Sequence, residues 1–158
     1  MYTVRPPLLA KPWFREAQWR VETTRKVLYL TFDDGPVPGV TDKALDVLDG
    51  YNAKATFFCL GKQVEAHPAL YQQLLERGHA VGNHTWDHPS GWQTPNDRYF
   101  ENIEQAATLI TSTLFRPPYG RIQRSPSMLW SKSPLSTSHI TTVYSFASAF
   151  NCERCMRP

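Results

Sequence analysis

Short apolar runs alternate with longer amphipathic stretches along the first three quarters of the chain. Apolar runs rich in β-branched and aromatic residues lie at 27–32, 55–60, 79–83 and 114–115, and each predicts a short strand. In the first run nearly every position is apolar, which is typical of a strand that is covered on both faces. Four strands separated by longer segments are therefore expected.

Amphipathic segments between these runs predict three helices. The first is capped by Thr41, the second has Pro68 in its first turn, and the third is capped by Asn96 or Asp97. Gly78 ends the second helix. Apolar residues recur three or four positions apart, as on the buried side of a helix. They are Ala44, Leu45, Leu48 and Tyr51, then Leu70, Leu74 and Leu75, then Phe100, Ile103, Ala107 and Ile110.

The order of these elements is βαβαβαβ, which predicts an α/β fold with parallel strands and right-handed crossovers. In such folds the chemistry gathers where the strands end at their carboxyl termini. The predicted domain covers residues 27–121, after an irregular, proline-rich lead-in at 1–26. Residues 122–158 form a Ser/Thr-rich tail with one acidic residue, Glu153, and only 141–146 alternates like a strand.

Composition narrows the class of protein. With 158 residues, 41% of them apolar and 20% charged, the chain fits one soluble globular domain. A net charge of +3 without a basic cluster argues against nucleic acid as a partner. No apolar stretch reaches the roughly 18 residues of a membrane span, and prolines interrupt the first twenty residues where a signal peptide needs an apolar run. A cytoplasmic location is the resulting default expectation.

Three polar stretches follow the predicted strands. The first, T-F-D-D-G-P at 31–36, places Asp33 and Asp34 directly after an apolar strand. Two neighbouring carboxylates repel each other, and their burial is unfavourable unless a cation or hydrogen bonds compensate. An ordinary turn is the alternative, because Asp-Gly-Pro is good turn chemistry.

The second stretch, N-H-T-W-D-H at 83–88, contains His84 and His88 at a spacing that suits two ligands of one metal ion. With Asp34 they form a set of two histidines and one carboxylate, which leaves a coordination position open for water. Two exposed surface histidines are the alternative reading of this pair alone.

The third stretch, F-R-P-P-Y-G at 115–120, follows the last strand. Its prolines stiffen the backbone, and Arg116 is placed to pair with Asp33. A polyproline turn is the alternative reading of this stretch. Trp92 lies in the loop before the third helix, where it stacks on a sugar ring or packs in the loop.

Together the three stretches resemble the NodB-homology polysaccharide deacetylases, the fourth family of carbohydrate esterases. The motif T-F-D-D-G-P is complete at 31–36, H-[ST]-x-x-H is present at 84–88, and R-x-P-Y is present at 116–119. The resemblance covers residues 25–121 and implies a partial, distorted (β/α) barrel of the NodB type with helices outside. It implies a metal-dependent hydrolase that removes N-acetyl groups from amino-sugar polymers or oligomers.

The resemblance also implies roles for individual residues. Asp34, His84 and His88 would bind a divalent metal ion, zinc or alternatively cobalt. Asp33 would be the general base, Arg116 would orient it, and the backbone N–H of Tyr119 would stabilise the oxyanion. Trp92 and Pro118 are the expected contacts of the N-acetylated carbohydrate substrate.

The sequence departs from the family pattern after residue 121. A later tryptophan motif and an L-x-H motif, which carries the family's general acid, have no recognisable counterpart. We therefore interpret the chain as a truncated or frameshifted deacetylase, with activity impaired by the loss of these motifs. Two alternatives are an inactive sugar-binding protein that retains the metal site, and a related amidohydrolase that acts on a non-sugar amide.

Overall fold

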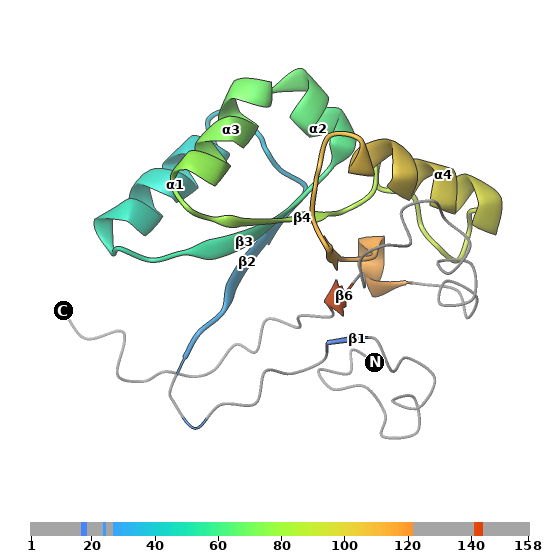
Figure 1. Cartoon of the computed structure of the whole chain (residues 1–158), viewed down its shortest axis with the longest axis horizontal. Coiled ribbons are helices and arrows are strands. Elements are labelled where there is room, and N and C mark those ends of the chain that lie inside the picture. Colours follow the sequence, from blue (N-terminus) through green and yellow to red (C-terminus); the bar gives the residue numbers. More distant parts are fainter. Residues whose placement is uncertain (1–16, 19–23, 25–26, 122–140, 144–158) are drawn as a thin grey trace.

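The computed structural model describes residues 17–18, 24, 27–121 and 141–143. Six short strands form one sheet in the order β1-β6-β5-β4-β3-β2, and every neighbouring pair is parallel (Figure 1). The strands are β1 (Ala17–Gln18), β2 (Leu30–Asp33), β3 (Ala55–Cys59), β4 (Ala80–Asn83), β5 (Leu114–Phe115) and β6 (Thr141–Val143). The predicted α/β architecture with parallel strands is confirmed.

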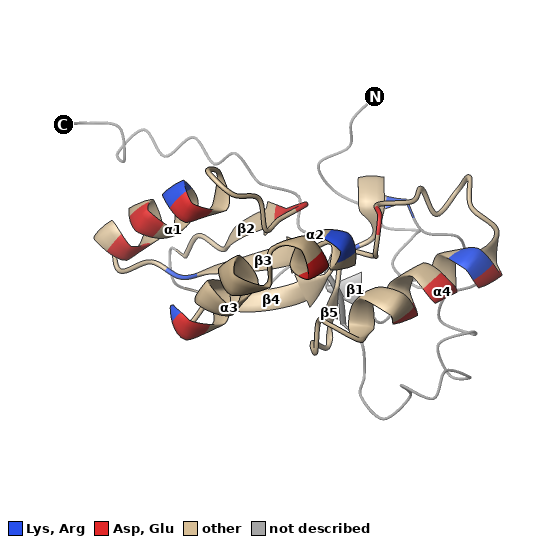
Figure 2. Ribbon diagram, turned by 90° about the horizontal axis from the view of Figure 1, so that it is seen from above, with Lys and Arg blue, Asp and Glu red and all other residues tan. Residues whose placement is uncertain are grey.

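Four α-helices lie together on one side of β3 and β4 (Figure 1). They are α1 (Thr41–Gly50), α2 (Gly61–Ala66), α3 (Pro68–Glu76) and α4 (Asn96–Ala107), and a 3₁₀ turn, η2 (Pro118–Gly120), follows β5. Three of these helices match the predicted ones. The sequence pattern did not predict α2, because six residues with one buried apolar side chain, Val64, are too few to show a helical period. Charged residues lie along the helices (Figure 2).

The main core lies between the helices and β3. It combines apolar side chains of β3, including Cys59, with those that the helices direct towards the sheet. Its buried members are Leu45, Leu48, Ala55, Phe57, Cys59, Val64, Leu70, Leu74, Ala106 and Ile110. Burial raises the pKa of the Cys59 thiol to about 12, so this cysteine stays a neutral core residue. A smaller cluster of Tyr99, Ile103 and Phe115 joins α4 to β5.

The prediction that residues 27–32 form a strand covered on both faces is wrong. The strand β2 begins only at Leu30, and Leu28 before it is 68% exposed. Within the described sheet β2 is an edge strand that pairs with β3 alone. An apolar run indicates a strand but does not show which of its residues the rest of the fold covers, so the exposure of this segment was not predictable from its composition.

Two helix details also differ from the predictions. Tyr51 lies beyond the end of α1 and is 82% exposed, and Leu75 of α3 is 41% exposed. Thr41 and Asn96 are the first helical residues rather than side-chain caps. The Thr41 hydroxyl instead accepts a hydrogen bond from the backbone N–H of Val37 at 2.8 Å, which closes the loop that leaves β2.

Most of the predicted lead-in at 1–26 and of the predicted tail at 122–158 lies outside the described residues. The exceptions include β1 and β6, which pair with each other and extend the sheet beyond β5. The strand-like alternation at 141–146 therefore corresponds in part to β6. Among the described helices, none combines the length and the apolar character that a membrane crossing requires.

Candidate active site

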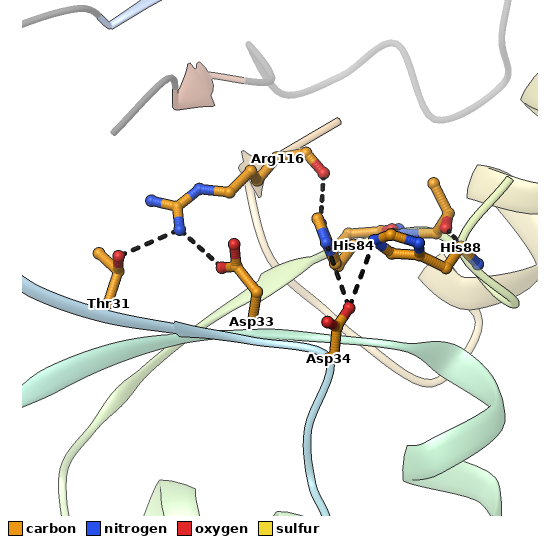
Figure 3. Close-up of polar contacts among 8 residues, drawn as sticks. Thr31, Asp33, Asp34, His84, His88 and Arg116 are labelled. Atoms are coloured by element: carbon orange, nitrogen blue, oxygen red, sulfur yellow. Dashed lines mark hydrogen bonds and ion pairs between the residues drawn. The ribbon is translucent and has the colours of Figure 1, made fainter. Parts of the chain in front are cut away.

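The polar residues singled out in the sequence meet at the carboxyl ends of three strands. Asp33 ends β2 and is followed by Asp34, His84 follows β4, and Arg116 follows β5 (Figure 3). Parallel register brings these ends to one edge of the sheet, since Cys59 of β3 pairs with Asn83 and Asn83 pairs with Phe115. Backbone bonds from His84 N–H to the Cys59 carbonyl and from Arg116 N–H to the Asn83 carbonyl hold the ends together.

Asp34, His84 and His88 offer three ligand atoms that lie within 4.8 Å of one another. The Oδ1 atom of Asp34 is 3.5 Å from Nε2 of His84 and 3.4 Å from Nε2 of His88. Ligands about 2.1 Å from a tetrahedral ion lie about 3.4 Å apart, so these separations suit a small divalent cation. Asp34 is largely exposed, which leaves one side of the triad accessible.

The second ring nitrogen of His84 supports the same conclusion. Nδ1 lies 2.7 Å from the carbonyl oxygen of Arg116, and a carbonyl only accepts, so Nδ1 carries the proton. Nε2 then points a lone pair towards the Asp34 carboxylate, an arrangement that a cation between the two would stabilise. The His84 side chain is 3% exposed, and burial lowers its pKa, which favours the neutral form that binds a metal ion.

Asp33 takes part in a different set of contacts. Its Oδ1 accepts a 2.6 Å hydrogen bond from Nη1 of Arg116, and the same nitrogen donates to the Thr31 hydroxyl at 3.0 Å (Figure 3). The side chain of Arg116 is 9% exposed, whereas that of Asp33 is 37% exposed. One carboxylate of the pair thus faces the histidines, and the other is held by a guanidinium with part of its surface open.

The guanidinium of Arg116 rests on an aromatic ring. Its central carbon lies 4.0 Å from the ring centroid of Phe58, which is itself 1% exposed. A Cβ atom on Gly82 would lie 2.5 Å from this ring, so only glycine at that position leaves room for Phe58 beside β4. Gly82 and Phe58 therefore position Arg116, although neither was predicted as a site residue.

The loop that carries the two histidines is held by its own polar side chains. The Oδ1 of Asn83 accepts from the backbone N–H of Thr85 at 2.7 Å, and the Thr85 hydroxyl accepts from the backbone N–H of His88 at 3.1 Å. The Nδ2 of Asn83 donates to the carbonyl of Ile103 in α4 at 3.0 Å. Asn83 and Thr85 are both buried, so these bonds are shielded from water.

A second anchor comes from α4. The Oδ1 of Asn102 accepts from the backbone N–H of Trp86 at 2.7 Å and from that of Asp87 at 3.3 Å. Its Nδ2 donates to the Asp87 carboxylate at 2.7 Å. An asparagine inside a helix gives no sequence signal for this role beyond its polarity. Its partners lie more than ten residues away and are known only from the fold.

Backbone strain also concentrates at this end of the sheet. Of the five non-glycine residues with positive φ among those described, four lie here: Asp34 (69°), Thr85 (73°), His88 (66°) and Tyr119 (58°). Such conformations are unfavourable by about 1–3 kcal/mol each and persist where surrounding contacts enforce them. Thr85 is a clear case because its side chain is β-branched.

The remaining predicted residues differ in their surroundings. Tyr119 is 63% exposed, and its ring lies edge-on to the His88 ring with centroids 4.6 Å apart. Trp92 is 64% exposed. The Pro118 side chain is fully buried, so its ring presents no surface to a substrate in this conformation. That part of the predicted substrate contact lacks support.

The described structure thus combines a parallel α/β sheet with a cluster of two histidines and one carboxylate at its strand ends. The sequence profile described as polysaccharide deacetylase matches residues 20–133, which is more than half of the chain. The chain belongs to this family. The predicted NodB-type fold and family resemblance are thereby confirmed.

Named relatives are similar over the same part of the chain. The peptidoglycan-N-acetylglucosamine deacetylase PgdA of Listeria monocytogenes is 40% identical over 107 residues, 64% of this chain and 23% of that protein. The peptidoglycan-N-acetylmuramic acid deacetylase PdaC of Bacillus subtilis is 40% identical over 108 residues, 65% of this chain and 23% of that protein. A peptidoglycan-N-acetylglucosamine deacetylase of Bacillus cereus is 38% identical over 109 residues, with coverages of 66% and 51%.

Solved structures agree with this assignment. The structure of the D285S mutant of PdaC from Bacillus subtilis superposes with a TM-score of 0.65 at 33% identity, over 80% of this chain and 61% of that one. The Bc1960 peptidoglycan N-acetylglucosamine deacetylase superposes with a TM-score of 0.75 at 28% identity, over 87% and 64%. The chain thus spans between about a quarter and a half of the length of these curated relatives.

Proposed function

We propose that the chain is a metal-dependent hydrolase that removes N-acetyl groups from amino sugars in a polymer or oligomer. The observation that carries the proposal is the division of the two neighbouring carboxylates: Asp34 completes a triad with His84 and His88, while Asp33 pairs with Arg116. Family membership and the names of the similar proteins support an acetylated carbohydrate as the substrate class. Zinc is the proposed ion, with cobalt as the alternative, because histidine nitrogen and carboxylate oxygen are typical zinc ligands.

A divalent cation bound by the triad would supply a Lewis acid that polarises the acetamide carbonyl and makes water more acidic. Asp33 accepts a proton from the attacking water, because its carboxylate is partly exposed and is not part of the triad. Arg116 fixes the direction of that carboxylate through the 2.6 Å hydrogen bond. The water oxygen bonds to the acetamide carbon and the carbon–nitrogen bond breaks, so that acetate leaves and the amine takes the proton that Asp33 had accepted.

His84 contributes by its fixed orientation. The hydrogen bond from Nδ1–H to the Arg116 carbonyl sets the ring plane and directs Nε2 towards Asp34. The same residue, Arg116, therefore positions the base through its side chain and a ligand through its backbone. Precise placement of both groups is what a hydrolytic site requires.

Acetate release tests the proposal. We expect the purified chain, loaded with zinc or cobalt, to release acetate from oligomers of N-acetylglucosamine. Asp33→Asn is expected to keep the bound metal ion and to lower kcat by about 10²–10⁴-fold, the usual contribution of a general base. His84→Ala is expected to lose both metal ion and activity. Asp46→Asn, a change of the same chemical kind on the exposed side of α1, is the matched control.

Three distinct outcomes would contradict the proposal. Metal retention without acetate release from any acetylated sugar would favour an inactive sugar-binding protein, and release from small cyclic amides alone would favour an amidohydrolase of another substrate class. An unchanged metal content in His84→Ala, measured by mass spectrometry of the native protein, would show that the triad does not bind the ion.

A further inference from the structure

An exposed aromatic and cationic surface adjoins the triad. It consists of Trp92, Tyr119 and Arg121, and we refer to these three residues as the rim cluster. The guanidinium carbon of Arg121 lies 5.1 Å from the ring centroid of Trp92 and 5.7 Å from that of Tyr119. Both distances are within the range of about 6 Å for a cation–π contact. The cluster brings together the loop before α4 and the turn after β5.

The rim cluster is continuous with the candidate metal site. The Tyr119 ring contacts the ring of His88, with centroids 4.6 Å apart, and His88 belongs to the triad. A series of ring contacts therefore runs from the triad through Tyr119 to Arg121 and Trp92. The rim cluster is therefore next to the triad, where the part of a substrate beside its reacting group would lie.

Arg121 differs from Arg116 in what satisfies its charge. Arg116 is buried and bonded to Asp33, whereas Arg121 is exposed. Within residues 27–121 no carboxylate forms an ion pair with Arg121. Its planar guanidinium lies near two aromatic rings. This contact already restricts the side chain, so less conformational entropy is lost when the group binds an anion.

We propose that the rim cluster is an anion-selecting subsite, in which Arg121 pairs with a carboxylate that the substrate carries within one sugar of the acetamide. The position of the acetamide rests on the proposed function. The planar guanidinium is suited to a bidentate pair with a carboxylate, and the exposed rings of Trp92 and Tyr119 offer apolar faces to a sugar ring. The substrate class is therefore an acidic N-acetylated glycan rather than a neutral one.

Binding to the metal-free chain tests this subsite without any turnover. The probes are two oligomers of equal length, in which N-acetylglucosamine alternates with N-acetylmuramic acid or with its carboxyl-amidated form. The amide keeps the sugar and removes only the charge. Calorimetry is expected to show that the wild-type chain binds the acid about fivefold more tightly than the amide, the effect of one exposed ion pair.

Substitutions test whether Arg121 causes the preference for the acid over the amide. Arg121→Gln is expected to abolish the ratio of the two affinities, and Arg121→Lys to retain the larger part of it. Lys54→Gln is the control, because it removes one exposed charge at the opposite ends of the strands, and it is expected to leave the ratio unchanged. Arg121 lies on the surface, so its replacement disturbs no core contact.

Equal affinity of the wild-type chain for acid and amide, or no measurable binding of either, would overturn the subsite. An equal loss of the ratio in Lys54→Gln would show a general charge effect and overturn it as well. A preserved preference together with the absence of acetate release would instead refute the proposed function and leave the subsite intact.

Discussion

The two ends of the parallel sheet each hold an arginine paired with aspartate, in opposite settings. At the carboxyl ends of the strands, Arg116 is 9% exposed, bonds Asp33 and lies over Phe58. At the amino ends, Arg77 bonds Asp46 at 3.1 Å and Asp49 at 3.0 Å, with side chains that are 32%, 71% and 43% exposed. The first pair has one geometry fixed by packing, whereas the second is screened by water.

The two ends of the sheet also differ in how rigidly their residues are held. Four strained backbone positions and the buried hydrogen bonds of Asn83 and Thr85 all lie at the carboxyl ends. The amino ends have short connections and exposed charges. Rigidity is therefore concentrated where a cation and a base must be held at fixed positions, in keeping with the proposed chemistry.

The largest effect on stability is expected from Arg116→Met, which breaks the pair at the carboxyl ends. Methionine covers Phe58 but leaves the Asp33 carboxylate without its guanidinium. We expect a loss of about 3 kcal/mol in the free energy of unfolding, at the lower end for a broken buried pair because Asp33 is partly exposed. Urea unfolding measures it, with Arg116→Lys as the charge-preserving control. A loss below about 0.5 kcal/mol, the usual range for a surface change, would contradict the packing argument.

Gly82→Ala tests the packing of Phe58 against Arg116 and is expected to have the next largest effect on stability. The added Cβ would lie 2.5 Å from the Phe58 ring and 3.2 Å from the Cβ of Leu114. Phe58 has to move, so we expect a loss of about 2 kcal/mol in the free energy of unfolding, as for other overpacked cores.

Gly50→Ala at the end of α1 is the matched control, because its Cβ would meet nothing within 4 Å. It is expected to raise stability by about 0.5 kcal/mol through the restriction of the unfolded chain. A similar response of the two glycine variants in thermal unfolding would show that the Phe58 ring is free to shift.

The sequence was sufficient to place the triad at one edge of the sheet. Asp34, His84 and His88 follow predicted strands, and parallel topology brings such positions together whatever the details of packing. The supports were not predictable in the same way. Asn102 and Gly82 act through partners that are distant in sequence, and neither polarity nor periodicity reveals those partners.

The position of β2 at the edge of the described sheet was also not predictable from the sequence. The run at 27–32 has the composition of a covered strand, yet Leu28 and Tyr29 are 68% and 57% exposed. The composition of a strand shows which side chains could be buried. Whether they are buried depends on the strands and helices that pack around them.

His79 provides a pH test of the amino ends, with a smaller expected effect. Its side chain is buried, Nδ1 accepts a 3.2 Å hydrogen bond from Ala55 N–H, and the described residues offer Nε2 no partner. Burial, followed by the nearby Lys54, lowers the pKa of His79. The unfolded chain therefore binds this proton at a higher pH than the folded chain, and protonation favours unfolding.

The contribution of His79 is present above its ordinary pKa of about 6.5 and is lost as the pH falls through the lower folded-state value. His79→Asn retains an acceptor oxygen without titrating, so it is expected to show a smaller fall in unfolding free energy between about pH 7.5 and about pH 5. The same fall in variant and wild type would assign the pH dependence to other groups.

Arg77→Gln is expected to give the smallest effect and completes the contrast with Arg116. The two aspartates it pairs with remain well hydrated when the guanidinium is removed, so at physiological ionic strength we expect no resolvable change in the unfolding midpoint. At low ionic strength, where screening is weak, a small loss is expected. The loss in Arg116→Met should be nearly independent of salt, because the pair is shielded by Phe58 and the strand ends. Unfolding of both variants over a series of salt concentrations measures the difference directly. The same salt dependence in both would show that burial does not distinguish the Arg116 pair from the Arg77 pairs.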